Sequence, residues 1–277
     1  MRIDAEVHLI CPSIIKSNHK LDEKEVFFKK NIYKHPDGQH ALGLATVEKL
    51  IESMESSGID KSLIMGLPFL NDALNSEINK YIDTACKRYP DKFLGLGVLD
   101  PFNDIKAQIR KFKHEYGFIG VKVIPSWQRF RLDDEDLYPA IEEIIKNNLI
   151  LLPHIGYIIS GSIEDGPHTL FNLAKRFPEL KVLAPHLGGL MCFHYLHEPI
   201  KKVFKNIRFI TSTPSTMKLV EFASEILDEN QLIFGTDYPF QPNHDQLSVV
   251  NRFEGLRIKP ELKEKIYAQN LIDFLNV

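Results

Sequence analysis

The sequence predicts an α/β protein that folds as a distorted (β/α)8 barrel, and three observations lead to this prediction. Short runs rich in Val, Ile, Leu and Phe alternate with helical patterns about eight times along 277 residues, a length typical of such barrels. These runs are apolar on both faces, as the buried strands of a parallel sheet are. Side chains that can bind a metal ion stand where several runs end, which is where barrel enzymes gather their catalytic groups.

Eight strands are expected, each a short apolar run followed by a loop. Val and Ile are frequent in these runs, and β-branched residues suit a buried pleated sheet. The expected strands are Arg2–His8, Lys61–Gly66, Phe93–Val98, Gly120–Ile124, Leu149–His154, Lys181–His186, Ile207–Thr211 and Leu232–Thr236.

Helices are expected between the strands, because apolar residues recur there on one helical face. The first of them places Val47, Leu50 and Met54 on such a face and stops before Gly58. Proline ends others, as expected of a residue that cannot continue a helix. The expected helices are Thr46–Ser57, Ala73–Tyr89, Asp104–Glu115, Tyr138–Asn147, Leu170–Phe177, Lys218–Leu227 and Glu261–Phe274.

The segment Leu9–Ala45 interrupts this alternation, being long, polar and rich in lysine. A loop of this length in a compact domain is usually a functional lid, a dimer contact or partly disordered. We expect one domain over residues 1–277, with 9–45 as an insertion at the barrel mouth. No Gly/Ser linker or repeat divides the sequence.

An open doubly wound sheet is the competing architecture. Closure is favoured because the candidate metal ligands are spread over the first, fifth, sixth and eighth strands. An open sheet would hold its outer strands too far apart for one site.

Composition and charge exclude several classes of function. The formal net charge is −3, which gives no electrostatic reason to expect a nucleic-acid or anionic-membrane partner. Three scattered cysteines, Cys11, Cys86 and Cys192, suit a reducing compartment better than a disulfide framework. No apolar run approaches the ~20 residues of a membrane span, and charge interrupts the start too soon for a signal peptide. A cytoplasmic protein is expected.

Five residues at expected strand ends are the candidates for chemistry. Glu6 and His8 are two residues apart, so in a strand they point to the same face, although each alone is also a plausible surface or core residue. His154 follows Pro153, and a buried, hydrogen-bonded histidine is its simplest alternative. His186 precedes Leu-Gly-Gly and either binds a metal or acts as an acid or base. Asp237, which a turn would also accommodate, could bind the metal or accept a proton from its water.

Together these motifs resemble the amidohydrolase superfamily, and most of all the amidohydrolase-related branch that includes aminocarboxymuconate-semialdehyde decarboxylase. The resemblance runs from Ile3 to about Asn270. Its most specific pieces are Ile-Asp-Ala-Glu-Val-His at 3–8, Gly-Val-Lys-Val at 120–123, Pro-His-Ile-Gly at 153–156, Pro-His-Leu-Gly-Gly at 185–189 and Phe-Gly-Thr-Asp-Tyr-Pro-Phe at 234–240.

The resemblance implies a distorted TIM barrel of the metal-dependent hydrolase type, with one divalent metal at the mouth. It assigns four metal ligands, and it gives His186 and Asp237 catalytic roles. The implied metal ligands are Glu6, His8, His154 and Asp237. The superfamily more often has His-x-His where this sequence has Glu6. Zn²⁺ is the first expectation; Mn²⁺ is the second, because a carboxylate at this position makes the site harder and more tolerant of Mn²⁺.

Four further residues are expected to bind the substrate. Lys122 lies in the fourth expected strand, near the strand-end position where binuclear members carry a carboxylated lysine. A second metal therefore stays open as an alternative, as does a plain lysine–acid pair. Trp127, Arg129 and Arg131 lie on the following loop, where arginine could bind a substrate carboxylate. A solvated loop is the alternative reading of this segment.

The leading expectation is a hydrolase that uses metal-activated water on a small carboxylated lactone, amide or ester. Asp237 would take the proton of the water, and His186 would stabilise or protonate the developing charge. The alternative is a nonoxidative decarboxylase of an aromatic or unsaturated acid, which Glu6 favours; a hydratase and a non-catalytic ligand-binding barrel remain as further possibilities. The expected partners are a small-molecule substrate and a second copy of the chain in a homodimer.

Overall fold

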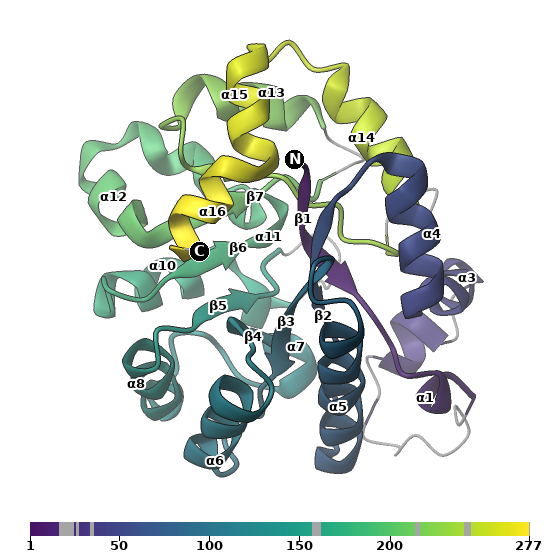
Figure 1. Cartoon of the computed structure of the whole chain (residues 1–277). Helices are drawn as coiled ribbons and strands as arrows, with labels where there is room; N and C mark the ends of the chain where they lie inside the picture. Colours follow the sequence, from purple (N-terminus) through teal and green to yellow (C-terminus); the bar gives the residue numbers. More distant parts are fainter. Residues whose placement is uncertain are drawn as a thin grey trace.

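Eight parallel strands, surrounded by helices, form one sheet in the computed structural model of this chain (Figure 1). The structure describes residues 1–16, 25, 28–33, 36–156, 162–213, 217–240 and 245–276. The strands follow one another in chain order, as in a (β/α)8 barrel. They are β1 (Ile3–His8), β2 (Lys61–Met65), β3 (Phe93–Val98), β4 (Gly120–Val123), β5 (Ile150–Pro153), β6 (Val182–Ala184), β7 (Ile207–Ile210) and β8 (Leu232–Ile233).

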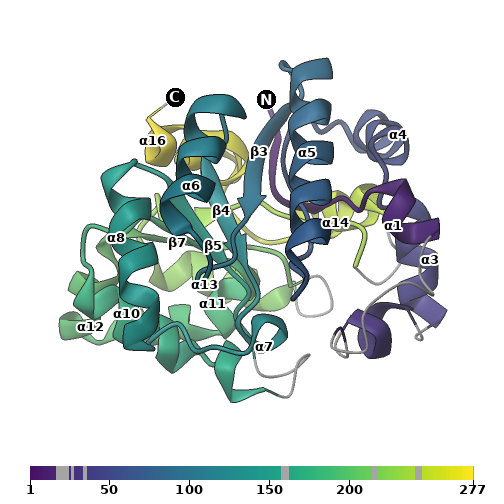
Figure 2. The same ribbon diagram turned by 90° about the horizontal axis from the view of Figure 1, so that it is seen from below.

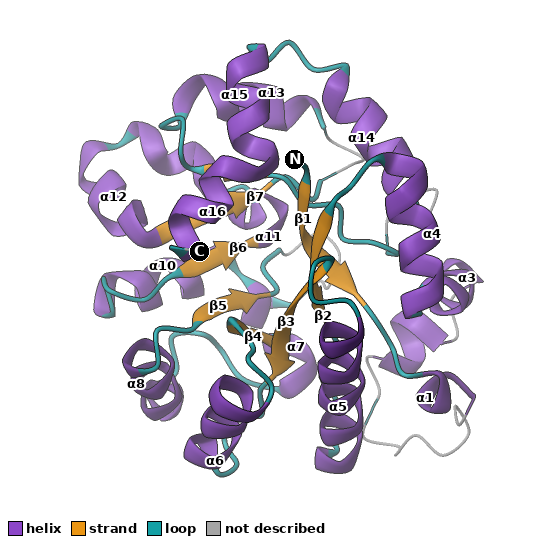
Figure 3. Cartoon of the chain, viewed as in Figure 1, coloured by secondary structure: helices purple, strands orange, loops and turns teal. Residues whose placement is uncertain are grey.

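The helices form an outer layer around the strands (Figure 3). The α-helices are α1 (Pro12–Lys16), α3 (Pro36–Leu44), α4 (Val47–Ser57), α5 (Asp72–Arg88), α6 (Ile105–Arg110), α7 (Pro125–Gln128), α8 (Tyr138–Lys146), α10 (Pro167–Arg176), α11 (Pro185–Gly189), α12 (Glu198–Val203), α13 (Lys218–Ile226), α14 (Gln246–Glu254), α15 (Pro260–Glu264) and α16 (Asn270–Leu275). Shorter 3₁₀ turns are Glu135–Leu137, Ile163–Asp165, Met191–Leu196 and Phe204–Asn206, and π-helical turns are Lys29–Tyr33, Lys111–Glu115 and Lys265–Gln269.

Local sequence signals fix the ends of the first long helices. The Thr46 side chain accepts a hydrogen bond from the Lys49 amide and caps α4, which ends at Gly58 in the left-handed conformation with φ of 68°. The Asn71 side chain caps α5 by accepting from two backbone amides of its first turn. These caps confirm that Gly58 stops the helix, as the sequence predicts.

Two apolar layers hold the barrel together. The larger one packs between the outer faces of the strands and the helices. The smaller one fills the barrel interior, with Leu63, Met65 and Leu152 among its members, and α16 covers it. The alternation of side chains along each strand separates the two layers. The chain termini lie at the end of the barrel opposite α7 (Figure 2).

The seam between β8 and β1 closes differently from the other strand pairs. Among the described residues, separate backbone hydrogen bonds join β1 to the segment after Ile233, instead of a regular ladder. Ala5 N donates to Phe234 O, Asp237 N to Glu6 O and His8 N to Tyr238 O, at 3.0, 2.9 and 2.7 Å. Three predicted metal ligands therefore lie along this seam.

The predicted barrel and its eight strands are confirmed, and the strand boundaries differ by up to three residues. The expected helix 104–115 is α6 continued by a π-helical turn, and the expected helix 261–274 is α15 and α16 joined by another. Helix α14 was not predicted. Its N-cap Asp245, which accepts from the Ser248 amide, is the signal that could have revealed it.

The segment 9–45 is more ordered in its described parts than the expected loop. It contains α1, α3 and a π-helical turn, whereas residues 17–24, 26–27 and 34–35 lie outside the described part. Ile10, Ile14, Phe28 and Leu42 form an apolar cluster with residues that follow β2 and β4. The segment therefore packs against the barrel at the end where the predicted site residues lie.

Candidate metal centre and active site

A bulge in β1 places the first two candidate ligands. The pairing of β1 with β2 shifts register between Asp4 and Val7, which inserts one extra residue into β1. Glu6 and His8 are buried, and Glu6 reaches Lys122 of β4 inside the barrel. Both side chains thus share one face, as the sequence predicts.

Asp237 meets this pair across the seam. His8 Nε2 lies 3.1 Å from Asp237 Oδ1 and 3.8 Å from Glu6 Oε1. One ligand atom from each of the three residues lies within 4.8 Å of the others. Asp237 adopts a left-handed backbone with φ of 61°, and Gly235 allows the close approach, since a Cβ there would lie 2.3 Å from Ile210 Cγ2.

Lys122 is the nearest cation to this cluster. Its side chain is fully buried, and Nζ lies 3.6 Å from Glu6 Oε1. Burial lowers the pKa of Lys122, and the neighbouring Glu6 and Asp237 oppose that change only in part. Burial raises the pKa of Glu6, but the charges of His186 and Lys122 and the interaction with His8 outweigh burial, so the net shift is downward.

His8 faces two carboxylates. Burial lowers the pKa of His8, but the interactions with Asp237 and Glu6 raise this pKa by more than burial lowers it, so the net shift is upward. In addition, neither Glu6 oxygen has a hydrogen-bond partner among the described residues. Two carboxylates and an imidazole that converge with such unpaired oxygens form a donor set suited to a divalent cation.

His154 and His186 lie together beside this cluster. Their ring centroids are 5.1 Å apart, at an angle of 69°. Burial, followed by the charges of His186 and Lys122, lowers the pKa of His154 well below its ordinary value. His154 is therefore neutral, which is the form of imidazole that binds a metal. It does not belong to the three residues whose ligand atoms converge within 4.8 Å.

An unusual turn carries His186. His186, Leu187, Gly188, Gly189 and Leu190 all have positive φ, from 55° to 71°, so helix α11 is a left-handed turn. Non-glycine residues cost roughly 1–2 kcal/mol each in this conformation. Such strain persists where the surroundings hold it, and it is concentrated at functional sites.

Ser212, which follows β7, orients His186. The Ser212 carbonyl oxygen lies 2.6 Å from His186 Nδ1, and Ser212 Oγ accepts a hydrogen bond from the His186 backbone amide at 3.1 Å. A carbonyl can only accept, so it places the proton of neutral His186 on Nδ1. Nε2 of neutral His186 is then a proton acceptor, and it becomes a donor only when the ring is protonated to imidazolium.

The three residues after β4 that were expected to bind substrate, Trp127, Arg129 and Arg131, have different surroundings. Trp127 is half-buried and packs edge-on against Phe28, with ring centroids 6.2 Å apart. Arg131 pairs with Asp133, through Nε–Oδ1 and Nη2–Oδ2 distances of 2.9 and 3.0 Å. Arg129 is exposed with φ of 64°. The described contacts join Trp127 to the apolar cluster that contains Ile10 and Phe28. They join neither arginine to the three converging candidate ligands.

Several residues around the site were missed by sequence reasoning. Phe240 packs its ring 5.6 Å from that of His8. Asp4 and Thr236 are buried beside the candidate ligands and are hydrogen-bonded to each other. Asp4 stands in the quoted motif at 3–8 and Thr236 in that at 234–240, so motif membership was the available signal. Ser212 has no such signal, since only the fold brings it to His186.

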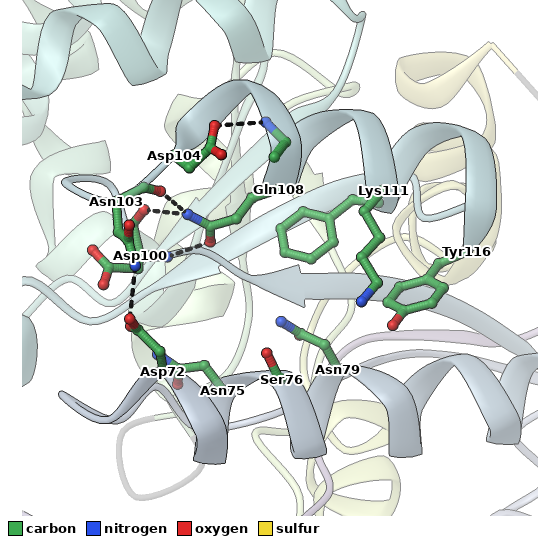
Figure 4. Close-up of a pocket in the computed structure, with 12 residues that line it drawn as sticks. Asp72, Asn75, Ser76, Asn79, Asp100, Asn103, Asp104, Gln108, Lys111 and Tyr116 are labelled. Carbon is green, nitrogen blue, oxygen red and sulfur yellow. Dashed lines mark hydrogen bonds between the residues drawn. The ribbon is translucent and has the colours of Figure 1, made fainter.

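A separate cavity of about 140 Å³ lies on the outside of the barrel, between α5 and α6. Figure 4 shows Asp72, Asp100 and Asn103 at one end of it and Lys111 and Tyr116 at the other. Burial and the neighbouring Asp72 raise the pKa of Asp100. Of the described residues that line this cavity, none is a predicted site residue.

Every helix among the described residues is too short or too polar to span a lipid bilayer.

The chain is similar to known decarboxylases. It is 21% identical over 274 residues to 2-amino-3-carboxymuconate-6-semialdehyde decarboxylase of Dictyostelium discoideum, a match that covers 82% of this chain and 76% of that protein. The structure of 5-carboxyvanillate decarboxylase from Sphingomonas paucimobilis matches with a TM-score of 0.82 and 17% identity, over 100% of this chain and 99% of that one.

A second solved structure carries a metal. The 5-carboxyvanillate decarboxylase of Novosphingobium aromaticivorans, complexed with manganese and 4-hydroxy-3-methoxy-5-nitrobenzoic acid, matches with a TM-score of 0.81 and 19% identity. This match covers 100% of this chain and 96% of that one.

These similarities correct one expectation. The prediction of a hydrolase that attacks a lactone, amide or ester is wrong, because the similar proteins are decarboxylases, which was the alternative prediction. The predicted family is confirmed, since a model of the amidohydrolase family matches residues 54–276. With a match over more than half of its length, this chain belongs to the amidohydrolase family.

Proposed function

We propose that this protein is a metal-dependent, nonoxidative decarboxylase of a small aromatic or unsaturated carboxylic acid. The observation that carries the proposal is the convergence of Glu6, His8 and Asp237 within 4.8 Å at the strand ends of a barrel. The similarity to decarboxylases supports the reaction type.

The residues present fit a divalent metal ion. Glu6 offers two buried oxygens without hydrogen-bond partners among the described residues, and His8 Nε2 and Asp237 Oδ1 face the same point. We propose these three as ligands, with the neutral His154 as the fourth. Two carboxylates make the set hard, which favours Mn²⁺ over Zn²⁺. When bound, the metal would hold the substrate carboxylate and a neighbouring oxygen.

The protein's own groups would manage the proton. In decarboxylation, the bond between the carbon and its carboxylate breaks, carbon dioxide leaves, and the carbon takes up one proton. His186 would supply this proton from Nε2 in its imidazolium form, because Ser212 O accepts the Nδ1 proton on the other side of the ring, and His186 would be left neutral. Asp237 is the second candidate acid. The buried ammonium group of Lys122 would stabilise the negative charges of Glu6 and of the substrate.

The experiment that tests this proposal is an assay of carbon dioxide release after reconstitution with Mn²⁺. The panel would hold 5-carboxyvanillate, 2,6-dihydroxybenzoate and 2-amino-3-carboxymuconate-6-semialdehyde, which represent the similar decarboxylases. We expect metal-dependent release from one acid of this chemical class, and its loss in Asp237→Asn. Stoichiometric metal binding without release from any aromatic or unsaturated acid would count against the reaction, and failure to bind Mn²⁺ would count against the site.

A further inference from the structure

The bulge in β1 turns two acidic side chains, those of Asp4 and Glu6, to opposite sides of the barrel wall. Asp4 bonds to Gln246 of helix α14 in the outer layer, whereas Glu6 reaches Lys122 of β4 in the interior. Two residues that are two apart would share one face in a regular strand. The register shift between Asp4 and Val7 removes this constraint and lets Glu6 and His8 face inward together.

Asp4 binds four donors from three separate segments. Its Oδ1 accepts from the backbone amides of Glu6 and Thr236, at 3.2 and 2.9 Å. Its Oδ2 accepts from Thr236 Oγ1 at 2.5 Å and from Gln246 Nε2 at 2.7 Å. The carboxylate is fully buried. It therefore connects the bulge, the segment after β8 and helix α14.

These contacts stand directly beside the candidate ligands. One bonded amide belongs to Glu6 itself, and Thr236 immediately precedes Asp237. The seam has no regular ladder in its described residues, so its geometry depends on such individual bonds. Thr236 Oγ1 also accepts from the Tyr238 amide at 3.1 Å, which fixes the turn that holds Asp237.

We propose that Asp4 is a positioning residue of the metal centre, which sets the distance between the β1 ligands and Asp237. This inference rests on the proposed metal site. Asp4 acts through the backbone amide of Glu6 and through Thr236, the residue that precedes Asp237. Groups that orient ligands in this way typically change metal affinity 10- to 100-fold when they are removed.

A purely structural role would give a different result. If Asp4 only stabilised the fold, its loss would lower the melting temperature and leave the metal affinity of the folded protein unchanged. The two roles separate when Mn²⁺ affinity is measured well below the melting temperature. The spectrum of bound Mn²⁺ in electron paramagnetic resonance adds a readout of ligand symmetry that does not depend on turnover.

The test compares Asp4→Asn with a matched pair at Thr236. Thr236→Val removes the hydroxyl bonded to Asp4, whereas Thr236→Ser keeps it. Ser62→Ala is the control, because Ser62 pairs with Asp4 in the sheet and is equally buried, and its Oγ has no partner among the described residues. Mn²⁺ dissociation constants, spectra and melting temperatures would be measured for each purified protein. If Asp4→Asn does not fold, the difference in Mn²⁺ affinity between Thr236→Val and Thr236→Ser tests the positioning role instead.

We expect at least a tenfold weaker Mn²⁺ affinity and an altered spectrum in Asp4→Asn and Thr236→Val. Thr236→Ser and Ser62→Ala should bind as the unaltered protein does. Unchanged affinity in Asp4→Asn and Thr236→Val, even with a lower melting temperature, would overturn the positioning role and leave the metal site standing. If the unaltered protein binds no Mn²⁺, the proposed function and this inference both fail.

Discussion

Lys122 Nζ lies 3.6 Å from Glu6 Oε1, and both side chains are completely buried. Removing one partner of a buried ion pair costs about 3–5 kcal/mol, because the remaining charge is left without compensation. A cation bound at Glu6 would take over that compensation. A bound metal ion and the lysine would therefore stabilise the same carboxylate.

Lys122→Met should accordingly destabilise the metal-free protein by about 3–5 kcal/mol and the Mn²⁺-loaded protein by clearly less. Urea unfolding with and without Mn²⁺ measures both values. Lys49→Met is the control, since Lys49 forms an exposed pair with Glu52 at 2.7 Å, and the expected change is below about 1 kcal/mol. An equal loss of stability with and without metal would contradict the shared role.

His186→Asn should retain the metal and lose turnover. Loss of a general acid typically lowers kcat about 10²- to 10⁴-fold. Asparagine tolerates the left-handed backbone that His186 adopts, with φ of 55°, so the fold should persist. Turnover at the normal rate, with the normal metal content by elemental analysis, would remove His186 from the mechanism.

Gly235→Ala should destabilise the protein and weaken metal binding. The added Cβ would lie 2.3 Å from Ile210 Cγ2 and 3.4 Å from the Glu6 amide nitrogen, so the segment after β8 must move away from its neighbours. Overpacking of this kind costs about 1–3 kcal/mol. Gly43→Ala is the matched control: its Cβ meets nothing within 4 Å in helix α3, and alanine there should be neutral or stabilising. Equal stability of the two variants would contradict the crowding at the seam.

The thiols of half-buried Cys86 and buried Cys192 should resist alkylation at pH 8. Burial raises the pKa of both Cys86 and Cys192 to about 12, so almost no thiolate is present at this pH. Since the pKa of both thiols in the folded protein lies above the ordinary thiol pKa of 9.0, the unfolded chain loses these protons first, and stability falls as pH rises above about 9. Iodoacetamide labelling with mass spectrometry checks this, with protein in guanidinium as the fully labelled reference. Rapid labelling of Cys192 in the folded protein at pH 8 would be inconsistent with its burial.

The sequence was informative wherever a residue acts through its place on a strand. Apolar runs identified all eight strands, and the ends of four of them pointed to Glu6, His8, His154, His186 and Asp237. These signals are local, because a buried parallel strand is apolar whatever surrounds it. The five residues lie close together in the fold, and their assigned roles remain predictions.

Features that depend on contacts between distant segments could not be predicted. Asp4, where the bulge begins, accepts hydrogen bonds from Thr236 and Gln246, which follow more than 200 residues later in the sequence. The left-handed turn holds Leu187, a residue that disfavours positive φ, because its side chain is completely buried against the barrel. The choice between hydrolysis and decarboxylation could not be made either, since one barrel supports many chemistries.

The bonds of Asp4 also have a consequence for how the protein is made. Its carboxylate belongs to β1, and its partner Gln246 follows 242 residues later in the sequence. During synthesis β1 must therefore wait, without its final partners, until helix α14 has emerged from the ribosome. A nascent chain that stops before Gln246 cannot complete the seam, so β1 and α14 mature together.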